Sequence, residues 1–534
     1  MANPGPPPTV EVTTAAAPSS AAPVVSSDQS RTRAVVAIND FPFGFNPHLR
    51  ADNSQLVADI SALVFPSAFN SGVLNANLLS SASEVAPPAG VAQRIRYSLN
   101  PQAQWSDGAP ITGADFEYLW QGIVTTPGAR NAGLYQAISN VTTSQNGRVI
   151  DVDLTTRVAD WTELFAFLLP AHLLDSTDFA TALQRSIPAS AGRYSVESID
   201  VGRGQIVLNR NDRFWGKAPV DIDVLELRGV RDSEQATALM RSGQVRLVDV
   251  WPTQTLREQL ELLGDVTLEI VSPTRQLRLE VNSTSETFHS AELRRTFLSL
   301  IDTAQVARLA TGRTVDVTVP YSQNSLLNTA SEDQLRQLSV ASQENPVRIG
   351  VDPTNPTALR AAETIKDSAG AKGVVVDVQE SRLGELAAAV LSRGELDAVI
   401  TVADTSVDAA NIASFFACTS TQSSALIPSA SAAPSSDASQ PVNASFLEPA
   451  KFAGNFSRFC PTDAANTQIA LLAGEMDPSA GLSRIREINA QEALYLPLLD
   501  ESRYRAIHNE SEVTAATSDW TRGLSSATLW DDID

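Results

Sequence analysis

The sequence lacks the signatures of several common protein classes. It contains no run of about 18 consecutive apolar residues, the length that a membrane-spanning helix needs. A G-x-S-x-G elbow, an HExxH pair, a Walker loop and a dinucleotide-binding fingerprint are also absent. These absences disfavour the common serine and zinc hydrolases, nucleotide-driven enzymes and nicotinamide-dependent oxidoreductases. We therefore expect that the protein is not an enzyme.

Histidine is scarce, with four residues in the 534-residue chain. They lie far apart in sequence and show no metal-ligand spacing: His48, His172, His289 and His508. A histidine in such a position is more often a surface or satisfied core residue than a ligand. We expect no metal site and no cofactor.

Cysteine is scarcer still, because the chain has two, Cys418 and Cys460. In an exported protein such a pair most simply forms a disulfide. The alternative, a catalytic or metal-binding role, lacks a histidine near either cysteine in sequence. The intervening residues 423–445 are a Ser/Ala/Pro-rich stretch that should not fold by itself.

Acidic residues outnumber basic ones by 61 to 39, which gives a net charge of -22. This balance argues against binding to nucleic acid and against electrostatic docking on anionic lipid. The chain opens with about 30 residues rich in proline, alanine, serine and threonine and without an apolar period. Such a composition is typical of a flexible leader, and equally of an ordinary disordered terminus.

The most informative stretch, NPQAQWSDGAPITGADFEYLW, runs from Asn100 to Trp120. Its SDGAP segment supplies turn residues. Thr112 precedes Asp115 by three positions, a capping-box spacing that satisfies free amides at a helix start. Apolar residues then follow at helical intervals, which predicts one buried face: Phe116, Leu119, Trp120 and Ile123.

This stretch resembles the WSDG-x-P-x-T-x-x-D signature of the family 5 solute-binding proteins, the peptide-binding components of bacterial ABC transporters. Residues 191–216, 238–250 and 279–302 resemble further blocks of the family in the same order, although Thr287 stands where proline is usual. The resemblance implies an α/β, two-lobed periplasmic-binding-protein fold of class II (cluster C, the dipeptide- and oligopeptide-binding type). Such a fold has mixed sheets and a ligand cleft between its lobes.

The resemblance also implies a domain organisation. Residues 1–32 should be a flexible leader that follows a lipid anchor. Lobe I should comprise residues 33–270, with a subdomain at about 76–185. Lobe II should comprise residues 271–500, with a low-complexity insertion at 419–450, and residues 501–534 should return to lobe I.

Local patterns predict individual elements within these lobes. In the first half we expect a strand at 33–38, helices at 53–65, 113–124 and 161–168, and a hairpin formed by RYSVESID and GQIVLNR. In the second half, apolar strands at 347–351, 374–378 and 398–402 alternate with helical segments. This alternation predicts a βαβαβ unit, and hence a parallel sheet.

Four side chains are candidates for the cleft. Phe43 and Asn46 belong to the loop DFPFGFNPH after the first strand, where the aromatic ring suits a sugar ring or lipid, or else the core of the lobe. Trp251 follows the strand VRLVDV and is as consistent with core as with a cleft wall. Asn282 ends the strand RLEVN, where its amide either bonds ligand or caps the turn.

Asp404 is a fifth candidate, taken from the family's peptide clamp. Peptide-binding members usually carry a segment like W-x-x-D-x-x-DP, whose first aspartate grips the amino terminus of the peptide. The corresponding residues 401–409 read TVADTSVDA, so Asp404 aligns with the clamp but Thr401 replaces the tryptophan. A carboxylate holds an ammonium group well. The lost tryptophan platform nevertheless disfavours a peptide pocket.

A narrower resemblance points to one branch of the family, envelope lipoproteins of mycobacteria and related corynebacteria. It is carried by residues 44–70, 103–121, 163–174 and 210–216 and by the late cysteine pair around a Ser/Ala/Pro insertion. It implies a lipoprotein on the outer face of the plasma membrane that promotes phosphatidylinositol mannoside, lipomannan and lipoarabinomannan synthesis.

The same narrower resemblance also implies binding partners. The partner would be a membrane mannosyltransferase or the phosphatidylinositol mannoside glycolipid itself, and the chain would be a monomer that meets the membrane only through its anchor. The alternative is an oligopeptide receptor that binds short peptides and serves an ABC permease.

Overall fold

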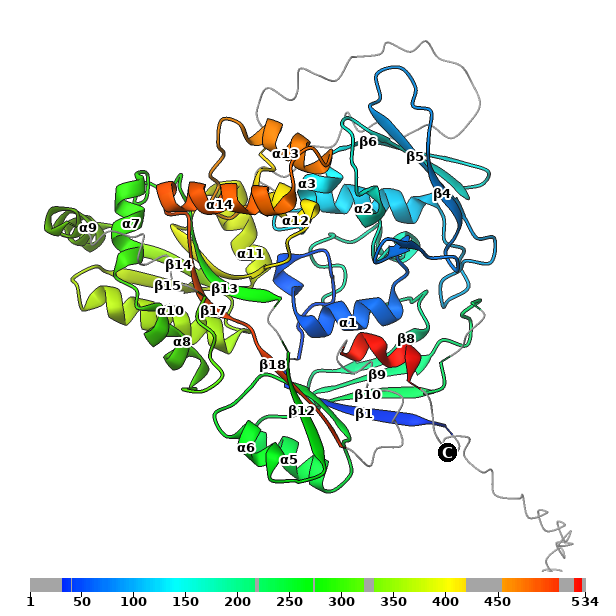
Figure 1. The fold of residues 1–534 in the computed structure, drawn as a ribbon, viewed down its shortest axis with the longest axis horizontal. Coiled ribbons are helices and arrows are strands. Elements are labelled where there is room, and N and C mark those ends of the chain that lie inside the picture. The colour runs from blue at the N-terminus through cyan, green and yellow to red at the C-terminus, as the bar shows by residue number, and fades with distance from the viewer. Residues whose placement is uncertain are drawn as a thin grey trace, which may run out of the picture.

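The computed structural model describes residues 31–39, 41–216, 220–271, 274–320, 331–418, 454–508 and 523–530. These residues form an α/β structure of two lobes built on a seven-stranded, a five-stranded and a four-stranded sheet, with a short β2–β3 ribbon (Phe69–Asn70 and Val73–Leu74) (Figure 1). Within these ranges no helix has the length and apolar character needed to cross a membrane. The expected leader up to residue 30 and the expected insertion at 419–450 lie outside the described residues.

Lobe I contains the seven-stranded sheet, of order β12-β18-β11-β1-β10-β9-β8. Its strands are β1 (Arg33–Ile38), β8 (Tyr194–Asp200), β9 (Gln205–Arg210), β10 (Val224–Gly229), β11 (Leu247–Val250), β12 (Val266–Val271) and β18 (Arg503–His508). The predicted first strand and the β8–β9 hairpin are both present. β1 is parallel to β10 and β11, whereas β18 runs antiparallel between β11 and β12. A strand from the end of the chain is thus an internal member of the first lobe's sheet.

Helices cover both faces of this sheet. One face packs on α1 (Gln55–Val64), which the Ser54 hydroxyl caps, and α1 in turn contacts the 3-10 helix η10 (Leu524–Leu529) (Figure 1). The other face packs on α5 (Ser233–Arg241) and α6 (Leu256–Glu261). The central strands β1 and β11 are therefore buried on both faces of the sheet, whereas β8 and β12 at its edges are partly exposed.

The subdomain of lobe I is an antiparallel sheet of order β4-β5-β7-β6, with α2 (Gly113–Thr125) against it. Its strands are β4 (Leu79–Val85), β5 (Gln93–Leu99), β6 (Ile138–Ser144) and β7 (Val149–Leu154). The predicted capping box is confirmed: the Thr112 hydroxyl accepts from the Ala114 amide at 3.3 Å, and Asp115 accepts from the Thr112 amide at 2.8 Å. The four predicted apolar residues of α2 are all buried.

The prediction of a helix at 161–168 is wrong. Only the 3-10 turn η3 (Trp161–Glu163) forms, and Phe165 and Phe167 then adopt positive φ angles of 59° and 49°. The Phe165 amide donates to the Tyr135 hydroxyl at 2.8 Å, and the Phe167 amide donates to the Ser67 hydroxyl at 3.0 Å. These tertiary bonds replace the helical ones and bury the Phe165 ring in the core.

Lobe II is built on the five-stranded sheet of order β15-β14-β16-β13-β17. The strands are β13 (Arg275–Val281), β14 (Val347–Val351), β15 (Val376–Glu380), β16 (Ala398–Asp404) and β17 (Tyr495–Asp500). β14 pairs in parallel with β15 and β16, so the predicted βαβαβ unit is present. The helices are α7 (Ala291–Ser299), α8 (Thr303–Thr311), α9 (Glu332–Glu344), α10 (Pro356–Gly370) and α11 (Leu383–Ala387), which continues as the π-helical turn Ala388–Arg393.

Three helices that follow β16 connect the lobes: α12 (Ala409–Phe415), α13 (Ala464–Leu472) and α14 (Pro478–Glu492) (Figure 1). Their buried side chains share one apolar core with lobe I, and α12 packs on α3 (Ala132–Tyr135). A Cβ at Gly133 would lie 3.0 Å from the backbone of Ala413, so this approach requires glycine. Cys418 after α12 forms a disulfide with Cys460, with a Cα–Cα distance of 6.0 Å.

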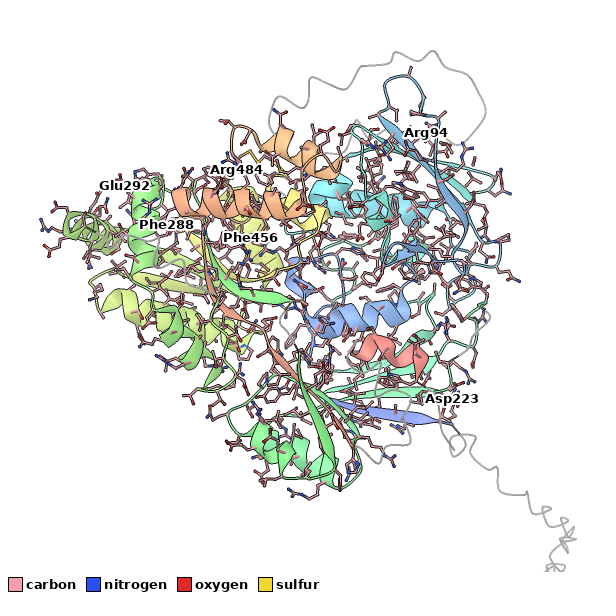
Figure 2. The ribbon with its side chains drawn as sticks, in the orientation of Figure 1. Arg94, Asp223, Phe288, Glu292, Phe456 and Arg484 are labelled. Atoms are coloured by element: carbon pink, nitrogen blue, oxygen red, sulfur yellow. A yellow bond between two sulfur atoms is a disulfide. The ribbon has the colours of Figure 1, made fainter. Side chains whose placement is uncertain are left out.

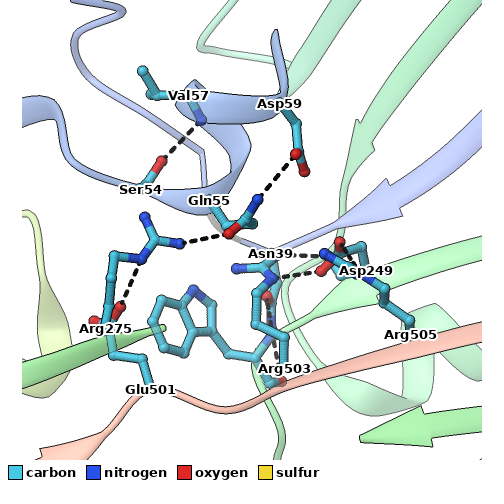
Figure 3. Close-up of polar contacts among 11 residues, drawn as sticks. Asn39, Ser54, Gln55, Val57, Asp59, Asp249, Arg275, Glu501, Arg503 and Arg505 are labelled. Atoms are coloured by element: carbon cyan, nitrogen blue, oxygen red, sulfur yellow. Dashed lines mark hydrogen bonds and ion pairs between the residues drawn. The ribbon is translucent and has the colours of Figure 1, made fainter. Parts of the chain in front are cut away.

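A network of charged side chains lies where the chain crosses between the lobes (Figure 3). Asp249 at the end of β11 is held between two arginines of β18, with its Oδ2 3.0 Å from Nε of Arg505 and an ion pair to Arg503. Asp59 on α1 faces this group and accepts from Gln55 at 2.9 Å. Burial, and then the charge of Asp249, raises the pKa of Asp59 to about 7.

This shift predicts that Asp59→Asn stabilises the protein at high pH. Because folding raises the pKa of Asp59, its neutral form favours the native state fully below about pH 4, and this advantage is lost as the pH rises through about 7. A three-unit shift corresponds to about 4 kcal/mol at most. Thermal unfolding should therefore show a higher Tm for the variant at pH 8 and little difference at pH 4.5. Equal differences at both pH values would contradict the raised pKa.

Candidate functional site

A cavity of about 840 Å³ lies between the lobes beside the carboxylate of Asp404, and we call it the Asp404 cavity. Its size falls in the range of small-molecule sites, roughly 300–1,000 Å³. Lobe I contributes Arg50, Asn53 and Arg130, and lobe II contributes residues of β13, β16, α12 and α14. The cavity therefore occupies the position in which a two-lobed binding protein encloses its ligand.

Asp404, the candidate clamp residue, already holds a cation from the opposite lobe. Its Oδ2 lies 2.6 Å from Nη2 and 3.1 Å from Nε of Arg130, and its Oδ1 accepts from the Asn53 amide at 3.2 Å. Burial alone would raise the pKa of Asp404, but the charge of Arg130 lowers it below its ordinary value. The carboxylate is thus ionised and paired within the chain.

A second ion pair joins the lobes at the floor of this cavity. Arg50, on the 3-10 turn η2 (Arg50–Asp52), pairs with Glu280 of β13 and donates to the Thr401 hydroxyl at 2.8 Å, while Thr401 donates to Glu280 at 2.7 Å. Arg50 also donates to the Gly454 carbonyl at 2.7 Å and lies 4.6 Å above the ring of Phe456, near the centre of the molecule (Figure 2). Burial would raise the pKa of Glu280, but the charge of Arg50 lowers it.

The remaining lining of the Asp404 cavity is rich in groups that bond hydroxyls. Five side-chain amides line it: Asn53, Asn131, Gln276, Asn411 and Asn455. All of them except Asn131 also donate to groups of the chain itself. Two aromatic rings, Phe415 and Tyr495, add apolar faces, and Arg278 lies 4.9 Å over the ring of Tyr495. Arg486 at the exposed rim forms no ion pair with any residue that the structure describes.

Two of the candidates from sequence lie at a different cavity. This cavity has a volume of about 410 Å³ and shares Arg50 and Asn53 with the first, and we call it the Trp251 cavity. Phe43 is 45% exposed there, with the Arg382 guanidinium 4.9 Å over its ring. Trp251 contributes a wall, and its amide donates to the Asn39 side chain at 2.7 Å.

The other two candidates, Asn46 and Asn282, are buried inside the lobes and line neither cavity. Asn46 donates to the Phe179 carbonyl at 2.9 Å and accepts from the His48 amide at 3.1 Å. Asn282 donates to the Leu396 carbonyl at 2.9 Å. The fold itself uses the amides of both residues.

Sequence reasoning missed the two arginines that close the cleft. Arg130 lies 274 positions from Asp404, and Arg50 lies 230 positions from Glu280. Neither arginine belongs to a local motif, so the sequence held no signal for these pairs. In the part of the chain that the structure describes, no group of histidine, cysteine and acidic side chains is arranged to hold a metal.

Glu280→Gln tests the ion pair at the cavity floor. The substitution keeps the side-chain shape but leaves the buried Arg50 without a counter-charge, which costs about 3–5 kcal/mol of stability. Chemical unfolding should show this loss, and small-angle scattering should show an increased radius of gyration as the lobes separate. Glu395→Gln is the control, because its pair with Arg393 is about half exposed and its loss should leave the stability nearly unchanged. Equal losses of stability in Glu280→Gln and Glu395→Gln would contradict the role of the Arg50–Glu280 ion pair in holding the lobes together.

Solved structures with the same arrangement are binding proteins. The oligopeptide-binding protein AppA of Bacillus subtilis, in complex with a nonapeptide, matches with a TM-score of 0.65 at 14% identity, over 94% of this chain and all of that one. The periplasmic EDTA-binding protein EppA matches with a TM-score of 0.58 at 19% identity, over 90% and 92% of the two chains. At these identities the likeness establishes the fold, a two-lobed solute-binding fold.

Comparison of the sequence with known proteins identifies the family of the chain, which the structural likeness alone does not. The chain is 31% identical over 345 residues to the probable monoacyl phosphatidylinositol tetramannoside-binding protein LpqW of Mycobacterium tuberculosis, a match that spans 62% of this chain and about half (51%) of that protein. The oligopeptide-binding protein OppA of the same organism is 30% identical over 199 residues, or 34% and 33% of the two chains. Residues 91–423 match the model of the bacterial extracellular solute-binding proteins, family 5, and the chain belongs to that family.

Proposed function

We propose that the protein is a non-enzymatic, lipid-anchored envelope protein whose Asp404 cavity binds the mannosylated headgroup of a phosphatidylinositol mannoside. Through this recognition it would regulate phosphatidylinositol mannoside, lipomannan and lipoarabinomannan synthesis, together with a membrane mannosyltransferase. The observation that carries the proposal is the ion pair between Asp404 and Arg130. This ion pair occupies the Asp404 carboxylate, which would otherwise bind the amino terminus of a peptide.

The ion pair disfavours a peptide because the ammonium of a peptide would have to displace Arg130. That exchange replaces one charge-assisted bond by another and also leaves the Arg130 guanidinium, which is 26% exposed, without its partner. Thr401 fills the position of the missing tryptophan and bonds to Glu280 instead of stacking on a ligand. Asp404 and Thr401 are therefore both engaged within the chain and do not form a clamp for the amino terminus of a peptide.

The lining favours a ligand with many hydroxyl groups. A sugar hydroxyl both donates and accepts, and side-chain amides match it with one acceptor and two donors each. The faces of Tyr495 and Phe415 suit the apolar faces of sugar rings. Arg278 and Arg486 add donors at positions suited to the phosphate of an inositol lipid. The name of the mycobacterial relative LpqW refers to a ligand of this chemistry.

Oligopeptide binding with an ABC permease is the second candidate. The position of Asp404 and the similarity to OppA favour it. The two candidates differ in what they require of Arg130. A glycan leaves the ion pair in place, whereas a peptide must break it.

We expect deacylated phosphatidylinositol mannosides to raise the Tm of the wild-type protein and mixed short peptides to leave it unchanged. A ligand that binds only the native state at 100 times its Kd stabilises it by about 2.7 kcal/mol. Arg486→Gln should weaken glycan binding several-fold in calorimetry. Arg484→Gln on the same helix is the matched control, because Arg484 does not line the cavity and forms ion pairs with Asp463 and Glu487.

Peptide binding by the wild type, lost in Asp404→Asn, would contradict the proposal and favour the transporter function. Arg130→Ala provides the converse test. It frees the carboxylate of Asp404, so this variant should bind peptide amino termini that the wild type rejects. The same peptides with acetylated amino termini should not bind it.

A further inference from the structure

The Trp251 cavity has a basic lining that glycan binding in the Asp404 cavity does not explain. Its lobe I side is the loop that carries Phe41 and Phe43, and its lobe II side is formed by the end of α8 and the start of α10. Four arginines besides Arg50 line it: Arg231, Arg313, Arg360 and Arg382. The same lining carries four carboxylates, Asp52, Asp352, Asp500 and Glu501, so five arginines face four acids.

The start of α10 supplies the first feature of an anion site. This helix has 15 residues, with Asn355 as its cap and Pro356 in its first turn. Pro356, Thr357 and Ala358 line the cavity. The positive end of the helix dipole is therefore directed at this space. The Thr357 and Ala358 amides already donate to the Asn355 side chain at 3.1 and 3.0 Å, so the helix contributes its dipole and not a first-turn amide.

Arg313 supplies a second and independent feature. Its side chain lines the same cavity although the residue is only 4% exposed. Its Nη1 donates to the Asp316 carbonyl at 2.9 Å, but its Nε has no hydrogen-bond partner among the described residues. A buried guanidinium with an unmet donor is costly. The Thr253 hydroxyl, also on the lining, is likewise buried without a partner in the described part of the chain.

The acidic groups of this cavity are engaged elsewhere and do not neutralise the arginines fully. Asp52 accepts from the Asn46 amide at 3.0 Å, and Asp352 accepts from the Leu383 amide at 2.8 Å. Asp500 accepts from Gln276 at 2.8 Å, and Glu501 lies 3.7 Å from Arg275. Asp352 also forms an ion pair with Arg382, whose Nε lies 3.6 Å from Oδ2, and the guanidinium of Arg382 is about one-third exposed.

We propose that the Trp251 cavity binds an anionic group of the phosphate class, at a site separate from the Asp404 cavity. Arg313 and Arg382 would bond the oxygens of the anion, and the first turn of α10 would add its dipole. Phe43 and Trp251 would contact the remainder of the ligand. Anion binding at this site does not depend on glycan binding in the Asp404 cavity.

Calorimetry and tryptophan fluorescence with inorganic phosphate and with glycerophosphoinositol test this site. We expect both anions to bind, and the emission change to disappear in Trp251→Phe while the heat of binding remains. Arg382→Gln should weaken binding at least tenfold. Arg382 is about one-third exposed, so this variant should keep its Tm. Arg313→Gln should act in the same direction, and its Tm reports whether the buried change has harmed folding.

Arg336→Gln, on the exposed surface of α9, is the control: Arg336 pairs with Asp333 and lines neither cavity, so this variant should bind both anions as the wild type does. Tighter binding of glycerophosphoinositol would identify a lipid headgroup as the source of the anion, and equal affinities would identify free phosphate. Absence of binding, or binding unchanged in Arg382→Gln, would overturn the proposal. Inorganic phosphate carries no sugar, so such a failure would leave glycan binding in the Asp404 cavity untouched.

Discussion

The buried ion pair between Arg50 and Glu280 is the constraint on which the arrangement of the two lobes depends. Each charge would be costly in the interior alone, so each lobe needs the other to satisfy it. Thr401, the Gly454 carbonyl and the ring of Phe456 complete the surroundings of Arg50. Arg50, together with Asn53 and Asp500, lines both cavities and so lies at the boundary between the two compartments.

The two compartments differ in chemistry because different elements border them. Side-chain amides and aromatic rings of β13, β17 and α12 line the Asp404 cavity, where Arg130 is already paired with the Asp404 carboxylate. Arginines and the start of α10 border the Trp251 cavity. The packing of α12 on α3 also connects the lobes, whereas the ion pairs of Asp249 join two neighbouring strands of the lobe I sheet. The solute-binding fold is thus combined with two ion pairs, Arg50–Glu280 and Arg130–Asp404, that hold its lobes together.

Much of the fold could be predicted because its signals are local. The Thr112–Asp115 capping box and the apolar face of α2 lie within a dozen residues, and the βαβαβ unit follows from alternating short patterns. The helix expected at 161–168 failed because bonds to Tyr135 and Ser67 lie far away in sequence. The candidate site failed in part for the same reason: Asn46 and Asn282 have partners inside the lobes that no local pattern reveals.

The sequence by itself determined the family, the alternation of elements and the position of the acid that aligns with the clamp, since each is written in contiguous residues. Only the tertiary structure decided what that acid contacts. Arg130 and Arg50 reach their partners across more than 200 intervening residues, and a charge pair leaves no periodic trace in either segment. The tertiary structure also assigned Phe43 and Trp251 to a separate cavity, because the surfaces that enclose a ligand exist only once both lobes have folded against each other.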